Sequence, residues 1–182
     1  VGASGYAGAE LTRLLLGHPA FQLVSVTSGQ DAGRRVRDVY PALAGCALLY
    51  TAHDAGAVIA AAEVAFLAVP HTAAMAMAPE LLEAGLTVID CSADFRLHDA
   101  GLFTAWYGEP HTAPDLLDEA VYGLPGLWRS ALPGARLVAC PGCYPTATLL
   151  AAAPAVRSGS VISSRVIVDA ISGVSGAGRS LS

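Results

Sequence analysis

The sequence is poor in charge and in aromatic rings. Only 14% of its 182 residues are charged and 7% are aromatic, and ten cationic side chains stand against fifteen anionic ones, which gives a net charge of −5. The longest basic cluster, Arg34-Arg35-Val36-Arg37, is too small to follow a phosphate backbone. We therefore expect no nucleic acid and no acidic membrane surface among the partners.

Long apolar runs and export signals are also missing. The most apolar stretch, residues 55–69, is mostly alanine, contains Glu63 and is shorter than the roughly 20 residues that a bilayer span needs. The start of the sequence lacks the basic region, apolar region and cleavage site of a secretory signal. Four scattered cysteines are too few for a disulfide scaffold. These features predict a protein of the cytoplasm.

Apolar residues nevertheless make up 54% of the chain, which is enough for a packed core and excludes disorder. Short apolar runs at residues 21–27, 64–69, 86–89 and 137–139 read as strands, and Ala/Leu helical patterns lie between them. This alternation predicts an α/β fold of the Rossmann type over residues 1–140, with a mostly parallel sheet and helices on both faces.

Caps and prolines predict the remaining elements. Asp54 and Thr72 suit helix N-caps, and Pro79 is expected to interrupt the second of these helices. Pro145 predicts a helix start, with the helix running toward residues 157–159. Residues 164–170 alternate as a strand, so we expect residues 141–182 to begin an α+β catalytic domain. Residues 99–133 predict irregular surface structure or short elements.

Both ends of the sequence suggest a piece of a longer protein. Val1 is not an initiator Met and stands directly before a glycine-rich turn, and the sequence stops at Ser182 inside another glycine-rich stretch. We therefore expect the first strand to be mostly missing and the catalytic domain to be incomplete.

Gly2, Gly5 and Gly8 stand at three-residue intervals before a helix whose Leu11 and Leu15 share an apolar face. Glycines let the backbone turn tightly and approach a ligand, and the N–H groups at a helix start favour a phosphate. Glycines at this spacing also occur in ordinary loops, but the following helix and strand favour a dinucleotide site.

The residues that follow the next predicted strand favour NADP over NAD. An NAD site places a carboxylate about 20 residues after the last glycine, where this sequence has Ser28-Gly29-Gln30. Arg34, Arg35 and Arg37 come next, and guanidinium groups suit a 2′-phosphate. The alternative is that these arginines form a surface cluster paired with Asp31 and Asp38.

The segment Cys140-Pro141-Gly142-Cys143 is the strongest candidate for chemistry. Cys143 follows a predicted strand and a Pro-Gly turn, just ahead of a helix whose N–H groups would stabilise a thiolate. The spacing of Cys140 and Cys143 also fits a redox pair, although Pro145 is expected to start the helix after both sulfurs. A zinc site lacks a second paired cluster of ligands, and a buried structural thiol fits Cys46, and to a lesser degree Cys91, better than Cys143.

Five motifs in order resemble the N-acetyl-γ-glutamyl-phosphate reductases, NADP-dependent enzymes of arginine biosynthesis in the aspartate-semialdehyde dehydrogenase superfamily. They are Gly2-Ala3-Ser4-Gly5-Tyr6-Ala7-Gly8-Ala9-Glu10-Leu11, Asp90-Cys91-Ser92-Ala93-Asp94-Phe95-Arg96-Leu97, Tyr122-Gly123-Leu124-Pro125, Pro141-Gly142-Cys143-Tyr144-Pro145-Thr146-Ala147 and Ser172-Gly173-Val174-Ser175-Gly176-Ala177-Gly178-Arg179. The resemblance covers the whole chain and implies a member about twice as long.

The resemblance implies Cys143 as the nucleophile that attacks an acyl phosphate and forms a thioester, which NADPH then reduces to an aldehyde. Arg96 is implied as a substrate-binding residue, or alternatively as the partner of Asp94 in a structural ion pair. The catalytic His would lie beyond Ser182, and the family usually forms homo-oligomers. The cofactor-binding residues implied are Gly2, Ser4, Gly5, Tyr6, Ala7, Gly8, Ser28, Arg34, Pro70, His71, Ser172 and Gly173.

Several points stay open at this stage. The loop from Ser172 to Gly178 also fits an ordinary turn, and Cys140 and Ile171 depart from the residues that the family places there, Asn and Lys. The substrate could instead be an acyl phosphate of lysine biosynthesis or aspartyl phosphate, since the sequence does not separate them. A non-catalytic NADP-binding module is the alternative outside the enzymes.

Overall fold

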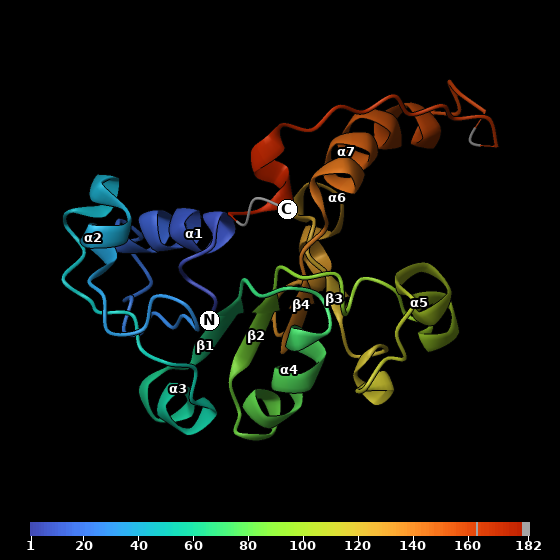
Figure 1. The fold of residues 1–182 in the computed structure, drawn as a ribbon. Helices are drawn as coiled ribbons and strands as arrows, with labels where there is room; N and C mark the ends of the chain where they lie inside the picture. Colours follow the sequence, from blue (N-terminus) through green and yellow to red (C-terminus); the bar gives the residue numbers. More distant parts are fainter. Residues whose placement is uncertain (163, 180–182) are drawn as a thin grey trace.

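The computed structural model describes residues 1–162 and 164–179 and contains a four-stranded, all-parallel sheet. The strand order is β1-β2-β4-β3, with Phe66 opposite Ile89 and Asp90 opposite Ala139. Helices flank the sheet, and α7 with the C-terminal segment lies beyond the carboxyl ends of the strands (Figure 1). The predicted Rossmann-type α/β class is confirmed.

The described residues form short strands and mostly short helices. The strands are β1 (Val64–Leu67), β2 (Thr87–Asp90), β3 (Val121–Tyr122) and β4 (Leu137–Ala139). The α-helices are α1 (Tyr6–Leu16), α2 (Val36–Val39), α3 (Ala55–Ala61), α4 (Ala73–Glu83), α5 (Ala100–Tyr107), α6 (Pro125–Trp128) and α7 (Cys143–Arg157). Four 3₁₀ turns complete the list: η1 (Pro41–Leu43), η2 (Pro114–Leu116), η3 (Arg129–Ala131) and η4 (Val174–Ala177).

The main core lies around the central strands. Leu67, Val88 and Leu137 from three neighbouring strands are fully buried, and α4 packs against them through Leu81 and Ala78. The other face of each strand is only partly buried, so the burial on both faces expected from nearly continuous apolar runs is reached on one face alone. The sheet therefore gives the loops at its carboxyl edge a rigid base.

Helix α4 corrects one sequence prediction. Pro79 lies inside the helix, which continues to Glu83, so the expected interruption is wrong. Thr72 is the N-cap as predicted, but its side chain makes no capping bond. The carboxylate of Asp94 caps the helix from a distant loop instead, accepting bonds from the backbone nitrogens of Thr72 (2.7 Å) and Met75 (2.9 Å). This cap and the packed inner face hold the helix together despite the proline.

The predicted strand at residues 21–27 is wrong except at its end, where Thr27 forms an isolated bridge to Thr51. The reason is a lack of partners. Val1 lies beside β1, bonded to the carbonyl of Phe66 and the nitrogen of Ala68, and the nitrogen of Ala3 reaches the carbonyl of Thr27. Residues 1–3 thus supply backbone partners only at the carboxyl end of the 21–27 segment.

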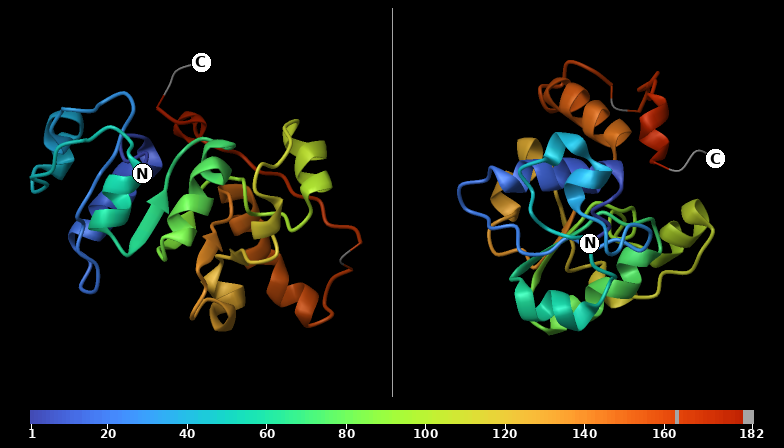
Figure 2. Two further views of the ribbon diagram at one scale, coloured as in Figure 1. Left: turned by 90° about the horizontal axis from the view of Figure 1, so that it is seen from below. Right: turned by 60° about the vertical axis from the view of Figure 1, so that its left-hand side comes forward.

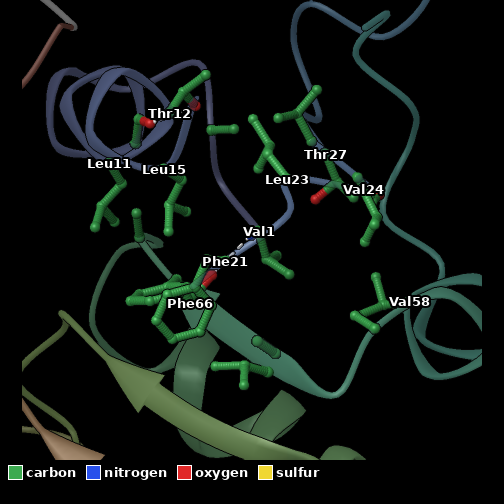
Figure 3. Close-up of a pocket in the computed structure, with 18 of the residues that line it drawn as sticks. Val1, Leu11, Thr12, Leu15, Phe21, Leu23, Val24, Thr27, Val58 and Phe66 are labelled. Carbon is green, nitrogen blue, oxygen red and sulfur yellow. Dashed lines mark hydrogen bonds between the residues drawn. The ribbon is translucent and has the colours of Figure 1, made fainter. Parts of the chain in front are cut away.

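The rest of that segment faces an apolar cavity of about 90 Å³ between α1, α3 and β1. Leu11 and Leu15 from α1, Phe21 and Leu23 from the segment, and Phe66 from β1 line it (Figure 3). The cavity borders the candidate site at Gly8, but its mostly apolar lining does not suit a phosphate or a nucleotide.

The region after β4 differs from the prediction in two ways. Helix α7 has Pro145 in its first turn and ends at Arg157, as predicted, but it begins at Cys143, so the expectation that it starts after both Cys140 and Cys143 is wrong. Residues 164–170 form no strand, because no other backbone in the described residues pairs with them. Strand β3, which pairs with β4, was not predicted, since two residues are too short to show a period.

Candidate active site

The three glycines before α1 meet three different environments. A Cβ on Gly2, whose φ is +74°, would lie 2.3 Å from the carbonyl oxygen of Ala68, and one on Gly8 would lie 2.4 Å from the carbonyl oxygen of Gly2. Gly2 therefore lets the turn approach β1, and Gly8 lets α1 approach the turn. Among residues 1–162 and 164–179, a Cβ on Gly5 would meet nothing closer than 3.7 Å, so the packing of these residues does not require glycine there.

The start of α1 is open to a ligand. Gly5 is the N-cap and provides no side-chain bond, while Tyr6 and Ala7 in the first turn are exposed. The first N–H groups of a helix have no partner within the helix and carry the positive end of its dipole. Beside them, the buried hydroxyls of Ser4 and Ser28 are hydrogen-bonded to each other at 2.6 Å. The turn therefore brings the predicted residues of the glycine motif next to Ser28.

A buried carboxylate anchors the next loop. Asp31 is 3% exposed and accepts bonds of 2.6 Å from Arg34 and from Arg179. Burial raises the pKa of the Asp31 carboxyl, but the hydrogen bonds from Arg179 and Arg34 outweigh burial and bring this pKa below its ordinary value. Arg34 thus makes the ion pair with Asp31 that the sequence analysis left open, while half of its side chain stays exposed.

Arg179 joins the C-terminal segment to the glycine turn. Its guanidinium also donates to the carbonyl of Ser4 at 3.2 Å and lies 5.8 Å from the ring centre of Tyr40, whose hydroxyl donates to the same carbonyl. In Figures 1 and 2 the chain after α7 runs back so that η4 lies near the start of α1. Arg179 belongs to the fifth sequence motif, but no pattern in the sequence predicts a role for it.

Cys143 is the first residue of α7, follows the N-cap Gly142, and is exposed. Its position at the start of a fifteen-residue helix places it in the field of the helix dipole. It opens onto a groove of about 700 Å³ that also includes Ser172 and Gly173. The structure therefore brings Cys143 and two predicted cofactor-binding residues to one surface.

Arg96 holds the ends of two strands. Its Nε donates to the carbonyl of Cys140 at 2.8 Å and its Nη2 donates to the carbonyl of Cys91 at 3.1 Å. Asp94 instead caps α4, so the alternative of an Asp94–Arg96 ion pair is wrong. The Nη1 of Arg96 would lie 3.2 Å from a Cβ on Gly142, which puts this guanidinium against the turn that carries Cys143.

Pro70 and His71 are exposed after the carboxyl end of β1. The ring of His71 lies 6.3 Å from that of Tyr107. Thr72, the next residue, has a φ of +71°, a left-handed conformation that is costly for a β-branched side chain. The bond from its nitrogen to Asp94 holds it there, so this edge is strained as well as exposed.

The floor of the site contains a buried acid. Asp90, at the end of β2, has no exposed surface and accepts bonds of 2.8 Å from the backbone nitrogen and the hydroxyl of Ser92. Burial raises the pKa of this carboxyl to about 6, although the bonds from Ser92 act in the opposite direction. Within the described residues, no three His, Cys, Asp or Glu side chains gather where they could hold a metal ion.

Comparison with known proteins identifies the family. The profile of the semialdehyde dehydrogenase NAD binding domain matches residues 1–135, and that of the semialdehyde dehydrogenase dimerisation domain matches residues 143–182. The chain belongs to the semialdehyde dehydrogenase family. Among the described residues of this family member, no helix is both long enough and apolar enough to cross a bilayer.

Curated relatives named N-acetyl-γ-glutamyl-phosphate reductase confirm the resemblance seen in the sequence. The chain is 51% identical to one from Acidithiobacillus ferrooxidans over 181 residues, which cover 99% of this chain and 52% of that protein. Those from Azotobacter vinelandii and Pseudomonas aeruginosa are each 52% identical, and each match covers 98% of this chain and 52% of the relative. This chain spans about half the length of the curated relatives it matches.

Solved structures agree on the fold. An aspartate semialdehyde dehydrogenase with NADP from Candida albicans has a TM-score of 0.61 at 15% identity, with 87% of this chain and 46% of that chain covered. Aspartate semialdehyde dehydrogenase II from Vibrio cholerae has a TM-score of 0.59 at 18% identity, covering 86% of this chain and 41% of that one. At these identities the likeness establishes the shared fold.

Proposed function

We propose that the chain carries the cofactor-binding half and the nucleophile of an NADPH-dependent N-acetyl-γ-glutamyl-phosphate reductase of arginine biosynthesis. The single observation that supports this most is the position of Cys143, which is exposed at the start of α7 on the groove that contains Ser172 and Gly173. The name shared by relatives at 51–52% identity supports the choice of substrate.

The glycine turn fits the pyrophosphate of a dinucleotide. The open space at Gly5 and the uncapped start of α1 leave room and N–H donors for an anion. At Gly2 and Gly8, in contrast, the protein's own backbone occupies the space that a side chain would take. We assign the pyrophosphate to residues 2–8 and the adenosine ribose to the surroundings of Ser28. Pro70 and His71, exposed past β1, border the same edge of the sheet and would flank the cofactor.

Arg34 is the residue proposed to favour a 2′-phosphate. Half of its side chain is exposed, and the Asp31 partner leaves other guanidinium N–H groups for a second anion. The bond between Asp31 and Arg179 keeps that carboxylate neutralised, which lowers its repulsion of a phosphate. This arrangement favours NADP over NAD.

Cys143 would act as a thiolate toward the acyl phosphate. Attack of the sulfur on the acyl carbon forms a thioester as the C–O bond to phosphate breaks and phosphate leaves with the electron pair. A thioester accepts hydride far more readily than a carboxylate, and NADPH is the hydride source. Arg96, fixed beside Gly142, is proposed to bind an anionic group of the substrate through Nη1.

The decisive experiment separates acylation from reduction in the full-length protein. Incubation with the acyl phosphate but without NADPH should leave an acyl group on the peptide that contains Cys143, detected by mass spectrometry. Cys143→Ser should remove this label and lower the reverse reaction from aldehyde, phosphate and NADP⁺ to NADPH by about 10³-fold or more.

Cys46→Ser is the matched control, because Cys46 is a buried thiol in the core cluster that includes Ala3 and Ala9, so this variant should leave acylation unchanged. Turnover near wild type in Cys143→Ser would refute the mechanism. A protein that binds NADPH but is never acylated would be the non-catalytic module instead.

We also propose a homo-oligomer of the cytoplasm. The dimerisation-domain match over residues 143–182 supports self-association, and the segment around Ile167 and Ile171, which are 96% and 95% exposed, provides apolar surface. Four free thiols suit a reducing compartment. Sedimentation of the full-length protein should give at least twice the monomer mass, and a monomer would refute the first proposal.

A further inference from the structure

Two cysteines stand opposite each other where the central strands end. The parallel register of β2 and β4 pairs Asp90 with Ala139, and the next residues along each strand are Cys91 and Cys140. The register continues at this step, since the nitrogen of Cys140 donates to the carbonyl of Asp90 at 2.7 Å. Partners in a parallel pair direct their side chains to the same face of the sheet.

The backbone at this pair is held from two sides. Arg96 donates to the carbonyls of both Cys91 and Cys140, and the nitrogen of Cys91 donates to the carbonyl of Leu67 on β1. Neighbouring strands lie about 4.8 Å apart, and a disulfide requires Cα atoms about 4.4–6.8 Å apart. The strand spacing therefore falls within the Cα range of a disulfide.

The two thiols interact in the reduced protein. A hydrogen bond from Cys140 lowers the pKa of the Cys91 thiol against the effect of burial, and the same bond together with burial raises the pKa of the Cys140 thiol. Cys91 is therefore the sulfur that ionises first. Both residues are only half-buried, so a small oxidant reaches them.

We propose that Cys91 and Cys140 form a redox modification site, at which a peroxide converts the two thiols to an intrachain disulfide. The Cys91 thiolate attacks hydrogen peroxide, the O–O bond breaks, and sulfenic acid and hydroxide form; the proton that the thiol released converts the hydroxide to water. Cys140 then attacks that sulfur, an S–S bond forms, and the S–O bond breaks to release a second water. Two sulfurs lose two electrons, which reduce one peroxide.

This couple is distinct from the spacing Cys140-x-x-Cys143 considered from the sequence. Cys143 is exposed on the first residue of α7, beyond the Pro141-Gly142 turn, whereas Cys140 belongs to the end of β4 and is engaged with Cys91. The disulfide proposed here consumes Cys140 and leaves Cys143 as a free thiol. The inference does not depend on the reaction proposed for Cys143.

Peptide mapping of the full-length protein tests the site. After treatment with hydrogen peroxide and blocking of free thiols with N-ethylmaleimide, a non-reducing digest should contain one cross-linked peptide pair that joins Cys91 to Cys140. Dithiothreitol should restore labelling of both cysteines together. Cys143→Ser should keep the cross-link, and Cys46→Ser is the matched control that should also keep it.

Cys91→Ser and Cys140→Ser should each abolish the cross-linked pair and leave the remaining cysteine open to labelling or to further oxidation. The wild-type digest alone can overturn the proposal, whatever the folding of the variants. A cross-link between Cys140 and Cys143 would do so, and so would oxidation of Cys91 and Cys140 that proceeds independently, without a bond between them.

Discussion

Replacing the buried Asp90 with asparagine should stabilise the protein, and the gain should grow with pH. Asp90 has no exposed surface, and burial raises its pKa from 3.8 to about 6. A shift of about 2 pKa units corresponds to about 3 kcal/mol of preference for the protonated form in the folded state. Above both pKa values the folded protein therefore carries a charged, buried carboxylate at that cost.

The sign follows from the protons bound by each state. Between pH 3.8 and about 6 the folded state holds more protons on Asp90 than the unfolded state, so this group lowers stability as pH rises and has its full effect above pH 6. Its cost is about 1.5 kcal/mol at pH 5 and about 3 kcal/mol at pH 8. The amide of the substituted asparagine would still accept from the nitrogen of Ser92 and could donate to its hydroxyl oxygen.

Urea unfolding of wild type and Asp90→Asn at pH 5 and pH 8 measures the difference between their free energies of unfolding. The contributions of the other carboxylates to this difference cancel, because both proteins have them. The variant should be more stable at both pH values, with the advantage larger by about 1.5 kcal/mol at pH 8. Asp99→Asn is the control, because this exposed residue caps α5 through Leu102 and asparagine caps about as well. An advantage that is equal at both pH values, or that shrinks as pH rises, would refute the reasoning.

Two further predictions separate packing from binding at the nucleotide site. Gly2→Ala should lower the melting temperature strongly, because its Cβ would overlap the carbonyl of Ala68. Gly5→Ala should change the melting temperature little but weaken NADPH binding, measured by calorimetry. Equal losses of melting temperature in the two variants would contradict the assigned roles. Arg34→Ala should weaken NADPH binding by about tenfold and NADH binding much less, since one charge-assisted bond to a phosphate is worth about 1.5–3 kcal/mol. Equal loss for both nucleotides would remove Arg34 as the selecting residue.

The parts of the fold that sequence predicted best are those with local causes. The strands at residues 64–67, 87–90 and 137–139 were predicted from short apolar runs, and in each strand one face is buried while the other is partly exposed. The strand expected at residues 21–27 has an equally good pattern but lacks a backbone partner along most of its length. Strand pairing depends on two segments, so the apolar pattern of one segment does not predict whether it finds a partner.

The same distinction applies to the site. Cys143 and the three glycines carry local signals, a turn followed by a helix, and the structure has a turn and a helix at both places. Asp94 capping α4, Arg179 bonded to Asp31, and Cys91 beside Cys140 are contacts between residues far apart in sequence, with separations of up to 148 positions. No periodicity or spacing marks them, and they appear only when the chain is folded.

Arg96 shows how distant contacts bring the segment of the proposed nucleophile beside the sheet. Two of its nitrogens donate to the carbonyls at the ends of β2 and β4, so the strand ends hold the guanidinium. Its third nitrogen lies 3.2 Å from where a Cβ on Gly142 would stand, so a larger residue there would push against the guanidinium. The turn before Cys143 therefore lies against a cation that the sheet holds, which gives the start of α7 a neighbour fixed by residues far away in the sequence.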